Sequence, residues 1–263
     1  MGGTSLKKDQ AHAEERLVDA KVMHLLDHLD ELRTRLIRAL MGVTFLFLIC
    51  LYYASPIINF LKLPLKNSLP KGSDTLHFTG PLEVVFADMK VAFFAAVILG
   101  SPLWLYQFWK FVEPALYVSE RKYVRPFIAA SIVLFAIGVA FSFYLMLPLC
   151  LEFLISIGLE VGVPMITVSD YLSVLMVMVL GFGFVFETPL ILVLLASLGV
   201  VNSAFLSLYR RHMVVIILII AAILTPPDPI SQLCMAVPLY VMYELSITLI
   251  KIMESRKKKE GGV

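Results

Sequence analysis

Three glutamates stand at places where a carboxylate is expected to do more than keep the chain soluble. Glu187 lies inside the apolar run VLGFGFVFETPLILVLL, Glu31 in the segment VMHLLDHLDELRTRLIRAL, and Glu120 in the polar stretch FVEPALYVSERKYVRP. A carboxylate in apolar surroundings can carry a proton, and carboxylates near a surface can hold cations such as a guanidinium group. These side chains are therefore the first candidates for a functional site.

Glu187 is the most conspicuous of the three, because an ionisable side chain inside a membrane span costs roughly a few kcal/mol. Gly181 and Gly183 before it and Pro189 after it are expected to loosen or bend the helix. One interpretation is a functional intramembrane carboxylate. The alternative is a protonated side chain that is hydrogen-bonded inside a helix bundle and has a structural role only.

Glu31 lies on the polar side of an amphipathic helix. Apolar residues recur at helical spacing from Val22 to Leu36, which predicts a helix that runs into the membrane. Arg35 follows Glu31 by four residues, so an ion pair within one helix, worth a few tenths of a kcal/mol, is one interpretation of this carboxylate. The other interpretation is a ligand-binding role.

Glu120 lies in a loop that prolines restrain. Pro114 restricts the backbone of Glu113 before it, and Pro126 suits the first turn of the helix that follows. Because two cations, beginning with Arg121, come directly after Glu120, a solvated charge cluster is the alternative to a shaped binding loop.

Further polar residues surround the motif TPPDP over 225–229. Asp228 is predicted to cap the following helix, with Pro229 at its first position. Thr225 and Gln232 flank the turn and are expected to form a polar patch near the external surface. Glu244 is expected near the opposite end of the same helix, at the membrane interface.

Membrane-spanning helices must position these residues. The chain is 59% hydrophobic and only 16% charged, with a mean hydropathy of +0.87, which is typical of a membrane protein. Long apolar runs in lipid suit helices, which satisfy their own backbone hydrogen bonds. The sequence therefore predicts an all-α, six-helix membrane bundle over the runs 39–61, 84–108, 126–151, 171–198, 213–224 and 230–250, with the external segments 62–83 and 152–170 as ordered caps.

The last two spans are short, and the fifth is the shortest. Between Arg211 and Pro226 the chain has about 14 residues, or roughly 21 Å of helix, against a hydrocarbon core of roughly 30 Å. A re-entrant pair of helices and a short span that thins the bilayer are the two interpretations. Because cations precede this run and none follows it within TPPDP, the charges favour a span.

The distribution of positive charge predicts the orientation. If the N-terminus is cytoplasmic, only Lys62, Lys66 and Lys71 among the 22 Lys and Arg residues fall in external segments, while Lys90 lies inside the second run. Both termini are therefore expected in the cytoplasm. The predicted organisation is a polar N-terminal tail over 1–21, a single transmembrane domain over 22–252 and a basic cytoplasmic tail over 253–263.

The remaining composition argues against several function classes. Cys50, Cys150 and Cys234 show no CxxC spacing and are expected to be buried apolar side chains, and the dispersed histidines form no HExxH pattern. We therefore expect no metal site and no cofactor. The net charge of +2 gives no nucleic-acid signal. No nucleophile–base pair occurs in the spans, so an enzyme is not expected.

Four motifs, in order along the chain, carry a resemblance to a known family. They are HLDELRTRL (28–36), SPLWLYQFWKFVEPALYVSER (101–121), FGFVFETP (182–189) and LTPPDPISQ (224–232). These segments resemble the signature segments of the TatC family, the polytopic core of the twin-arginine protein translocase. The resemblance covers about residues 24 to 250.

The resemblance implies a six-helix, cup-like bundle in the cytoplasmic membrane that binds paired-arginine signal peptides and moves folded proteins with the proton-motive force. It implies partners as well: TatA- and TatB-type single-span subunits and other copies of the chain. It assigns signal-peptide binding to Glu31, Arg33, Phe111 and Glu120, an intramembrane polar role to Glu187, partner docking to Thr225 and Gln232, and turn roles to Pro64 and Asp228.

Arginine chemistry agrees with what the resemblance implies. A guanidinium group is always charged, and its planar fork matches a carboxylate at two points. Two adjacent arginines would therefore be held by two carboxylates a fixed distance apart, and Glu31 and Glu120 are expected on the same membrane face. The competing hypothesis is a proton-coupled small-molecule transporter with Glu187 as the proton carrier.

Overall fold

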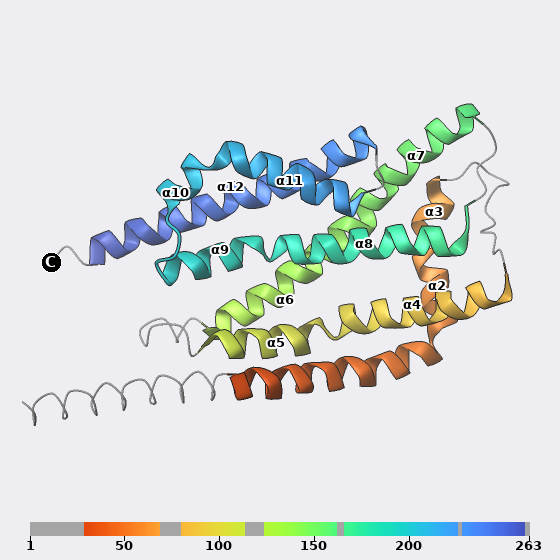
Figure 1. Cartoon of the computed structure of the whole chain (residues 1–263), viewed down its shortest axis with the longest axis horizontal. Coiled ribbons are helices and arrows are strands. Elements are labelled where there is room, and N and C mark those ends of the chain that lie inside the picture. Colours follow the sequence, from red (N-terminus) through yellow and green to blue (C-terminus); the bar gives the residue numbers. More distant parts are fainter. Residues whose placement is uncertain (1–28, 69–79, 114–123, 162–165, 226–227, 261–263) are drawn as a thin grey trace, which may run out of the picture.

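The structure, a computed structural model, describes residues 29–68, 80–113, 124–161, 166–225 and 228–260, and nearly all of these residues are helical. Long helices run side by side along the longest axis of the molecule (Figure 1). The elements are a first helix over Leu29–Tyr52, then α2 Ala54–Leu61, α3 Leu63–Ser68, α4 Pro81–Leu99, α5 Ser101–Val112, α6 Val124–Phe141, the π-helical η3 Ser142–Met146, α7 Leu147–Val161, α8 Val168–Phe186, α9 Thr188–Ser197, α10 Ser203–Leu208, α11 Arg210–Leu224 and α12 Pro229–Glu260.

The predicted all-α membrane fold is confirmed. Within the described residues, the helical stretches Leu29–Tyr52, Arg125–Gly158, Val168–Ser197 and Pro229–Arg256 are long and apolar enough to cross a bilayer. The helices in the second and fifth predicted spans are not long or apolar enough by themselves to meet this criterion. α4 has three charged residues in its 19, and α11 is only 15 residues long.

The second predicted span is broken at Gly100, because Pro102 cannot donate a backbone hydrogen bond and ends the preceding helix. α4 stops at Leu99 and α5 begins at Ser101. The Trp104 indole Nε1 donates to the carbonyl oxygen of Val97 at 3.0 Å, which satisfies one acceptor that the break leaves open. The break therefore changes the direction of α5 relative to α4 without leaving the Val97 carbonyl unpaired.

The third predicted span is longer than the apolar run suggested. Pro148 sits near the start of α7 and removes one helical hydrogen bond, and the π-helical η3 lies directly before it. α7 then continues to Val161, well into the predicted external segment 152–170. Apolar residues continue at helical spacing beyond Leu151, with polar side chains such as Glu152 between them, so the helix does not end where the run was expected to end.

One end of the bundle is covered by α2 and α3. Only α3 lies in the predicted cap 62–83, whereas α2 lies in the predicted first span, whose long helix already ends at Tyr52. α2 and α3 cross the end of the bundle where α4 and α8 begin (Figure 1). The Tyr171 hydroxyl on α8 donates to the carbonyl of Leu61, and the Phe60 and Phe143 rings stack with centroids 5.0 Å apart. Pro64 is buried in α3, so this cap is part of the packed structure.

The core is centred on α8, which contributes nine buried residues. The first helix stands apart from it: only 6% of its most apolar window is buried. Small side chains at Ala92, Ala95 and Ala96 let this helix approach α4 closely, as is common between membrane helices. Its remaining large apolar side chains are exposed and suit a lipid environment.

The start of the first helix and the end of α12 lie at the same end of the bundle (Figure 1). The end of α5, the start of α6 and the junction between α9 and α10 lie at that end too. The predicted topology also places these points on one side of the membrane, and that this side is the cytoplasmic one stays a prediction from the charges.

Candidate functional site

Glu31 lies in the first turn of the described part of the first helix. Arg35 Nε donates to its Oε1 at 2.9 Å, and Arg35 Nη2 contacts the same oxygen. The ion pair predicted from the four-residue spacing is therefore present. The Glu31 side chain is 32% exposed and Arg33 is exposed on the same helix, so the carboxylate remains reachable from outside the bundle.

The loop with Glu120 is the second part of the predicted site. Glu120 lies outside the described residues, as do all residues from 114 to 123. The helices on either side of the loop are described: α5 ends at Val112 and α6 begins at Val124. Both of these ends lie at the end of the bundle from which the first helix starts (Figure 1).

The last turn of α5 adds a charge pair and an aromatic side chain. Phe111 is half-buried there. Lys110 Nζ lies 2.8 Å from Glu113 Oε2, so this additional carboxylate already has a cation beside it within its own helix turn. Glu113 and Glu31 are therefore alike in having a cation of their own helix beside them.

Glu187 is buried in the protein, with 4% of its surface exposed. It occupies the junction where α8 ends and α9 begins. Its Oε2 accepts a hydrogen bond of 2.6 Å from the hydroxyl of Ser131 on α6, while its Oε1 is buried with no hydrogen-bond partner among the described residues. The predicted bonding inside the bundle is thus present, but it satisfies only one of the two carboxylate oxygens.

The glycines near Glu187 permit close packing rather than a bend at their own positions. A Cβ atom on Gly183 would lie 2.7 Å from the Phe135 ring. The helix interruption comes at Glu187 itself, two residues before Pro189, as expected for a proline that removes a backbone donor.

The turn before α12 has the predicted cap. The Ser231 backbone N–H donates to Asp228 Oδ2 at 2.6 Å, and α12 begins at Pro229. Thr225 and Gln232 do not form an open polar patch. The Thr225 hydroxyl is buried and donates to the Ala221 carbonyl, and Gln232 Nε2 donates to the Leu218 carbonyl, both at 2.9 Å. These side chains instead satisfy carbonyl groups at the end of α11.

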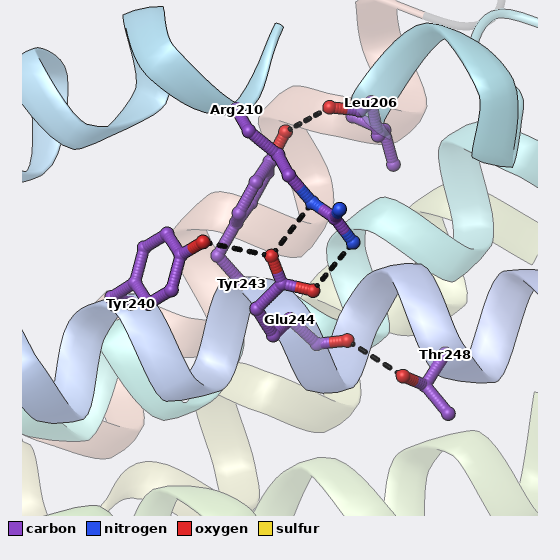
Figure 2. A network of polar contacts seen from close by, with 6 residues as sticks. All are labelled: Leu206, Arg210, Tyr240, Tyr243, Glu244 and Thr248. Carbon is purple, nitrogen blue, oxygen red and sulfur yellow. Dashed lines mark hydrogen bonds and ion pairs between the residues drawn. The ribbon is translucent and has the colours of Figure 1, made fainter. Parts of the chain in front are cut away.

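A second polar cluster ties α11 to α12 at the opposite end (Figure 2). Arg210 Nε and Nη2 lie 2.8 and 2.9 Å from the two oxygens of Glu244, and the Tyr240 hydroxyl donates to Glu244 at 2.9 Å. The Tyr243 hydroxyl donates to the Leu206 carbonyl of α10 at 2.8 Å. Among the described residues, the Glu244 carboxylate therefore binds a guanidinium group at two points.

Sequence reasoning missed the partners in these contacts. Ser131 lies 56 residues from Glu187, and Arg210 lies 34 residues from Glu244. The Lys90 ammonium group contacts the hydroxyls of Ser169 and Ser173 on α8 at 3.2 and 3.4 Å, although these serines lie 79 and 83 residues away. A buried serine or a lone lysine gives no local signal of such a contact.

Comparisons with known proteins agree with this arrangement. The profile of the family described as Sec-independent protein translocase protein (TatC) matches residues 27–238. Proteins of that name from Campylobacter jejuni and Aquifex aeolicus are each 38% identical and align over 90% of this chain and 98% of their own length. The protein of the same name from Escherichia coli K12 is 37% identical over 85% of this chain and 86% of its own length.

Solved structures match as well. A crystal structure described as twin arginine translocase receptor TatC superimposes with a TM-score of 0.77 at 36% identity, over 86% of this chain and 98% of its own. A second one, in DDM, gives a TM-score of 0.78 over 85% and 99%. The chain therefore belongs to the TatC family of Sec-independent protein translocase proteins.

Proposed function

We propose that this protein is the signal-peptide receptor and polytopic core of a twin-arginine translocase. It is a multi-pass protein of the inner membrane. In this role it binds paired-arginine signal peptides on the cytoplasmic side and passes folded cargo across the membrane at the expense of the proton-motive force. The observation that carries the proposal is the family match over residues 27–238, which contains all four motifs.

The proposed peptide site consists of Glu31, Arg33, Phe111 and Glu120. Glu31 already holds a guanidinium group, that of Arg35, so its oxygens have access to such a ligand. The Arg210–Glu244 pair gives the geometry expected for the complex, with two nitrogens of one guanidinium facing two carboxylate oxygens. Glu31 and Glu120 would each accept one arginine of the signal in this way.

The proposed partners are TatA- and TatB-type single-span subunits and further copies of this chain. Thr225 and Gln232 are the proposed docking residues, at the external end of α11. Both side chains donate to α11 carbonyls in the free chain. A polar group on a partner helix would therefore have to compete with these hydrogen bonds or accept from the second amide proton of Gln232. Pro64 and Asp228 keep structural roles in α3 and in the α12 cap.

A peptide crosslinking experiment tests the receptor role. We expect a signal peptide with paired arginines and a photoreactive group beside them to label the chain near Glu31 and near residues 114–123. The same peptide with both arginines replaced by lysine should lose most of this labelling, because an ammonium group is a point charge and cannot reproduce the two-point contact. Labelled sites are read by mass spectrometry of the purified membrane protein.

The lysine peptide is also the control for general electrostatic attraction, since it has the same net charge. Equal labelling by the two peptides, or labelling confined to the basic tail after residue 252, would contradict the receptor proposal. Labelling near Glu31 without labelling near residues 114–123 would contradict only the assignment of Glu120 to the site.

A substitution at Glu187 is expected to impair transport after the signal peptide has docked. Glu187→Ala removes the acceptor for Ser131 and leaves that hydroxyl buried without its partner, at a cost of about 1–3 kcal/mol. We expect export of a twin-arginine reporter to fall at least about tenfold while peptide crosslinking near Glu31 is retained. Export is measured as the exported fraction of the reporter at equal membrane levels of the variant.

Two further variants separate charge from hydrogen bonding. Glu187→Gln keeps an oxygen that can accept from Ser131, and Ser131→Ala removes the donor but leaves the carboxylate. If ionisation of Glu187 matters, Glu187→Gln is defective and Ser131→Ala is active. Normal export by Glu187→Ala would show that this carboxylate is not needed for transport.

A further inference from the structure

Sulfur-bearing side chains gather in one small cavity that the translocase function does not use. The cavity has a volume of about 30 Å³ and lies between η3, α7, α8 and the start of α12. Its lining includes two cysteines and three methionines: Met146, Cys150, Met178, Cys234 and Met235. A volume of this size holds one water molecule or one ion.

The two cysteines that line this cavity come from different helices, α7 and α12. Cys150 Sγ on α7 donates to the hydroxyl of Ser231 on α12 at 3.3 Å, and Cys234 lies one helical turn after Ser231. Cys150 is buried, as the sequence predicted, whereas Cys234 is exposed, so the prediction of a buried apolar side chain is wrong at this position.

The chemistry of these side chains selects a particular class of ligand. Thiolates and thioethers are soft donors that prefer ions such as Cu(I), whereas carboxylate and carbonyl oxygens suit Mg²⁺ and Ca²⁺. Among the described residues, no group of three His, Cys, Asp or Glu side chains could hold a metal ion. A site in this part of the molecule therefore has to rely on the methionine sulfurs as well as the two cysteines.

We propose that this cavity binds one monovalent soft cation of the Cu(I) class between α7 and α12. The ion replaces the proton of one cysteine thiol, which leaves to solvent, and the second cysteine and the thioethers complete the coordination. The charge of the ion and that of the single thiolate cancel, so binding adds no net charge to a low-dielectric site. Asp228 lies two residues before the lining residue Ile230, and its Oδ1 is buried without a hydrogen-bond partner among the described residues, which further favours a cation nearby.

The chain provides its own matched controls. Cys50 is also buried, but it lies in the small-residue contact between the first helix and α4, away from the cavity. Met242 lies on α12, packs against the core and does not line the cavity. The variants Cys50→Ser and Met242→Leu therefore make the same chemical changes at sites where no effect on binding is expected.

The experiment measures Cu(I) binding by the full chain in detergent, with a chromophoric Cu(I) chelator as the competitor and ascorbate as the reductant. We expect one Cu(I) per chain. Cys150→Ser and Cys234→Ser should each weaken binding at least about tenfold, as loss of a metal ligand does. Met178→Leu, which conserves volume, should also weaken it, while Cys50→Ser and Met242→Leu should match the unmodified chain.

Gel filtration and circular dichroism establish that each variant is folded. Bound Cu(I) should raise the unfolding temperature of the unmodified chain and of Cys50→Ser, but not that of Cys150→Ser. Equal binding by all variants, or a stoichiometry that simply follows the number of cysteines, would overturn the site. A disulfide between Cys150 and Cys234 in the freshly purified chain, detected by mass spectrometry without reduction, would also overturn the metal site. It would show that the two cysteines form a redox pair instead.

Discussion

A double variant with Glu31→Gln and Glu120→Gln is expected to insert normally into the membrane but to export less than about a tenth of a twin-arginine reporter. Each glutamine keeps the size of the side chain and removes the charge that a guanidinium group requires. An exposed ion pair is worth up to about 1 kcal/mol, so the loss of two pairs corresponds to roughly 2 kcal/mol, or about thirtyfold in binding. Each single variant should show a smaller loss.

Two nearby carboxylates serve as controls for this result. Glu113→Gln removes a carboxylate that is paired with Lys110 at the end of α5, and Asp30→Asn changes an exposed neighbour of Glu31. Both should export normally. The measurement is the exported fraction of the reporter, with the amount of each variant in the membrane determined by immunoblot. Full export by the double variant would show that the two glutamates do not form the signal site.

Gly138→Ala is expected to destabilise the bundle by about 1–3 kcal/mol, the usual cost of overpacking a core. A Cβ atom at this position of α6 would lie 2.6 Å from the carbonyl oxygen of Phe182 on α8. Because that oxygen belongs to the backbone, relief requires a shift of one helix against the other. The other close contact of this Cβ atom is Phe186, which directly precedes Glu187, so transport should fall together with stability.

Gly181→Ala on α8 is the matched control. The Cβ atom there would come within 2.3 Å of a methyl group of Leu224, but a side-chain tip can rotate away. We expect this variant to unfold within a few degrees of the unmodified chain in detergent, whereas Gly138→Ala unfolds at a clearly lower temperature. Thermal unfolding followed by gel filtration compares the two. Equal stability of the variants would mean that the α6–α8 contact relaxes more easily than the structure indicates.

The family assignment decides between the hypotheses that Glu187 alone left open. A buried carboxylate in a membrane span suits both a translocase and a proton-coupled small-molecule transporter. The match over residues 27–238 places the chain in a protein-transport family, and no observation among the described residues favours a small-molecule substrate. The role of each predicted site residue remains a proposal, and Glu120 lies outside the described residues.

The sequence by itself determined the features that depend on short stretches of chain. Apolar runs specified helices, because the backbone in lipid has to satisfy its own hydrogen bonds. Asp228 followed by Pro229 specified the start of α12, and the spacing of Glu31 and Arg35 specified their ion pair. The four motifs were enough to identify the family. In each case the residues that decide the outcome lie within a few positions of one another.

Only the tertiary structure decided which distant side chains meet. The partner of Glu187 is Ser131 and the partner of Glu244 is Arg210, and neither pairing has a local signal. The same holds for the contact of Gly138 with Phe182 and for the sulfur-lined cavity between α7 and α12. These contacts depend on the rotation and depth at which helices pack. Many alternative packings of equally apolar helix faces are compatible with the same pattern of hydrophobic residues.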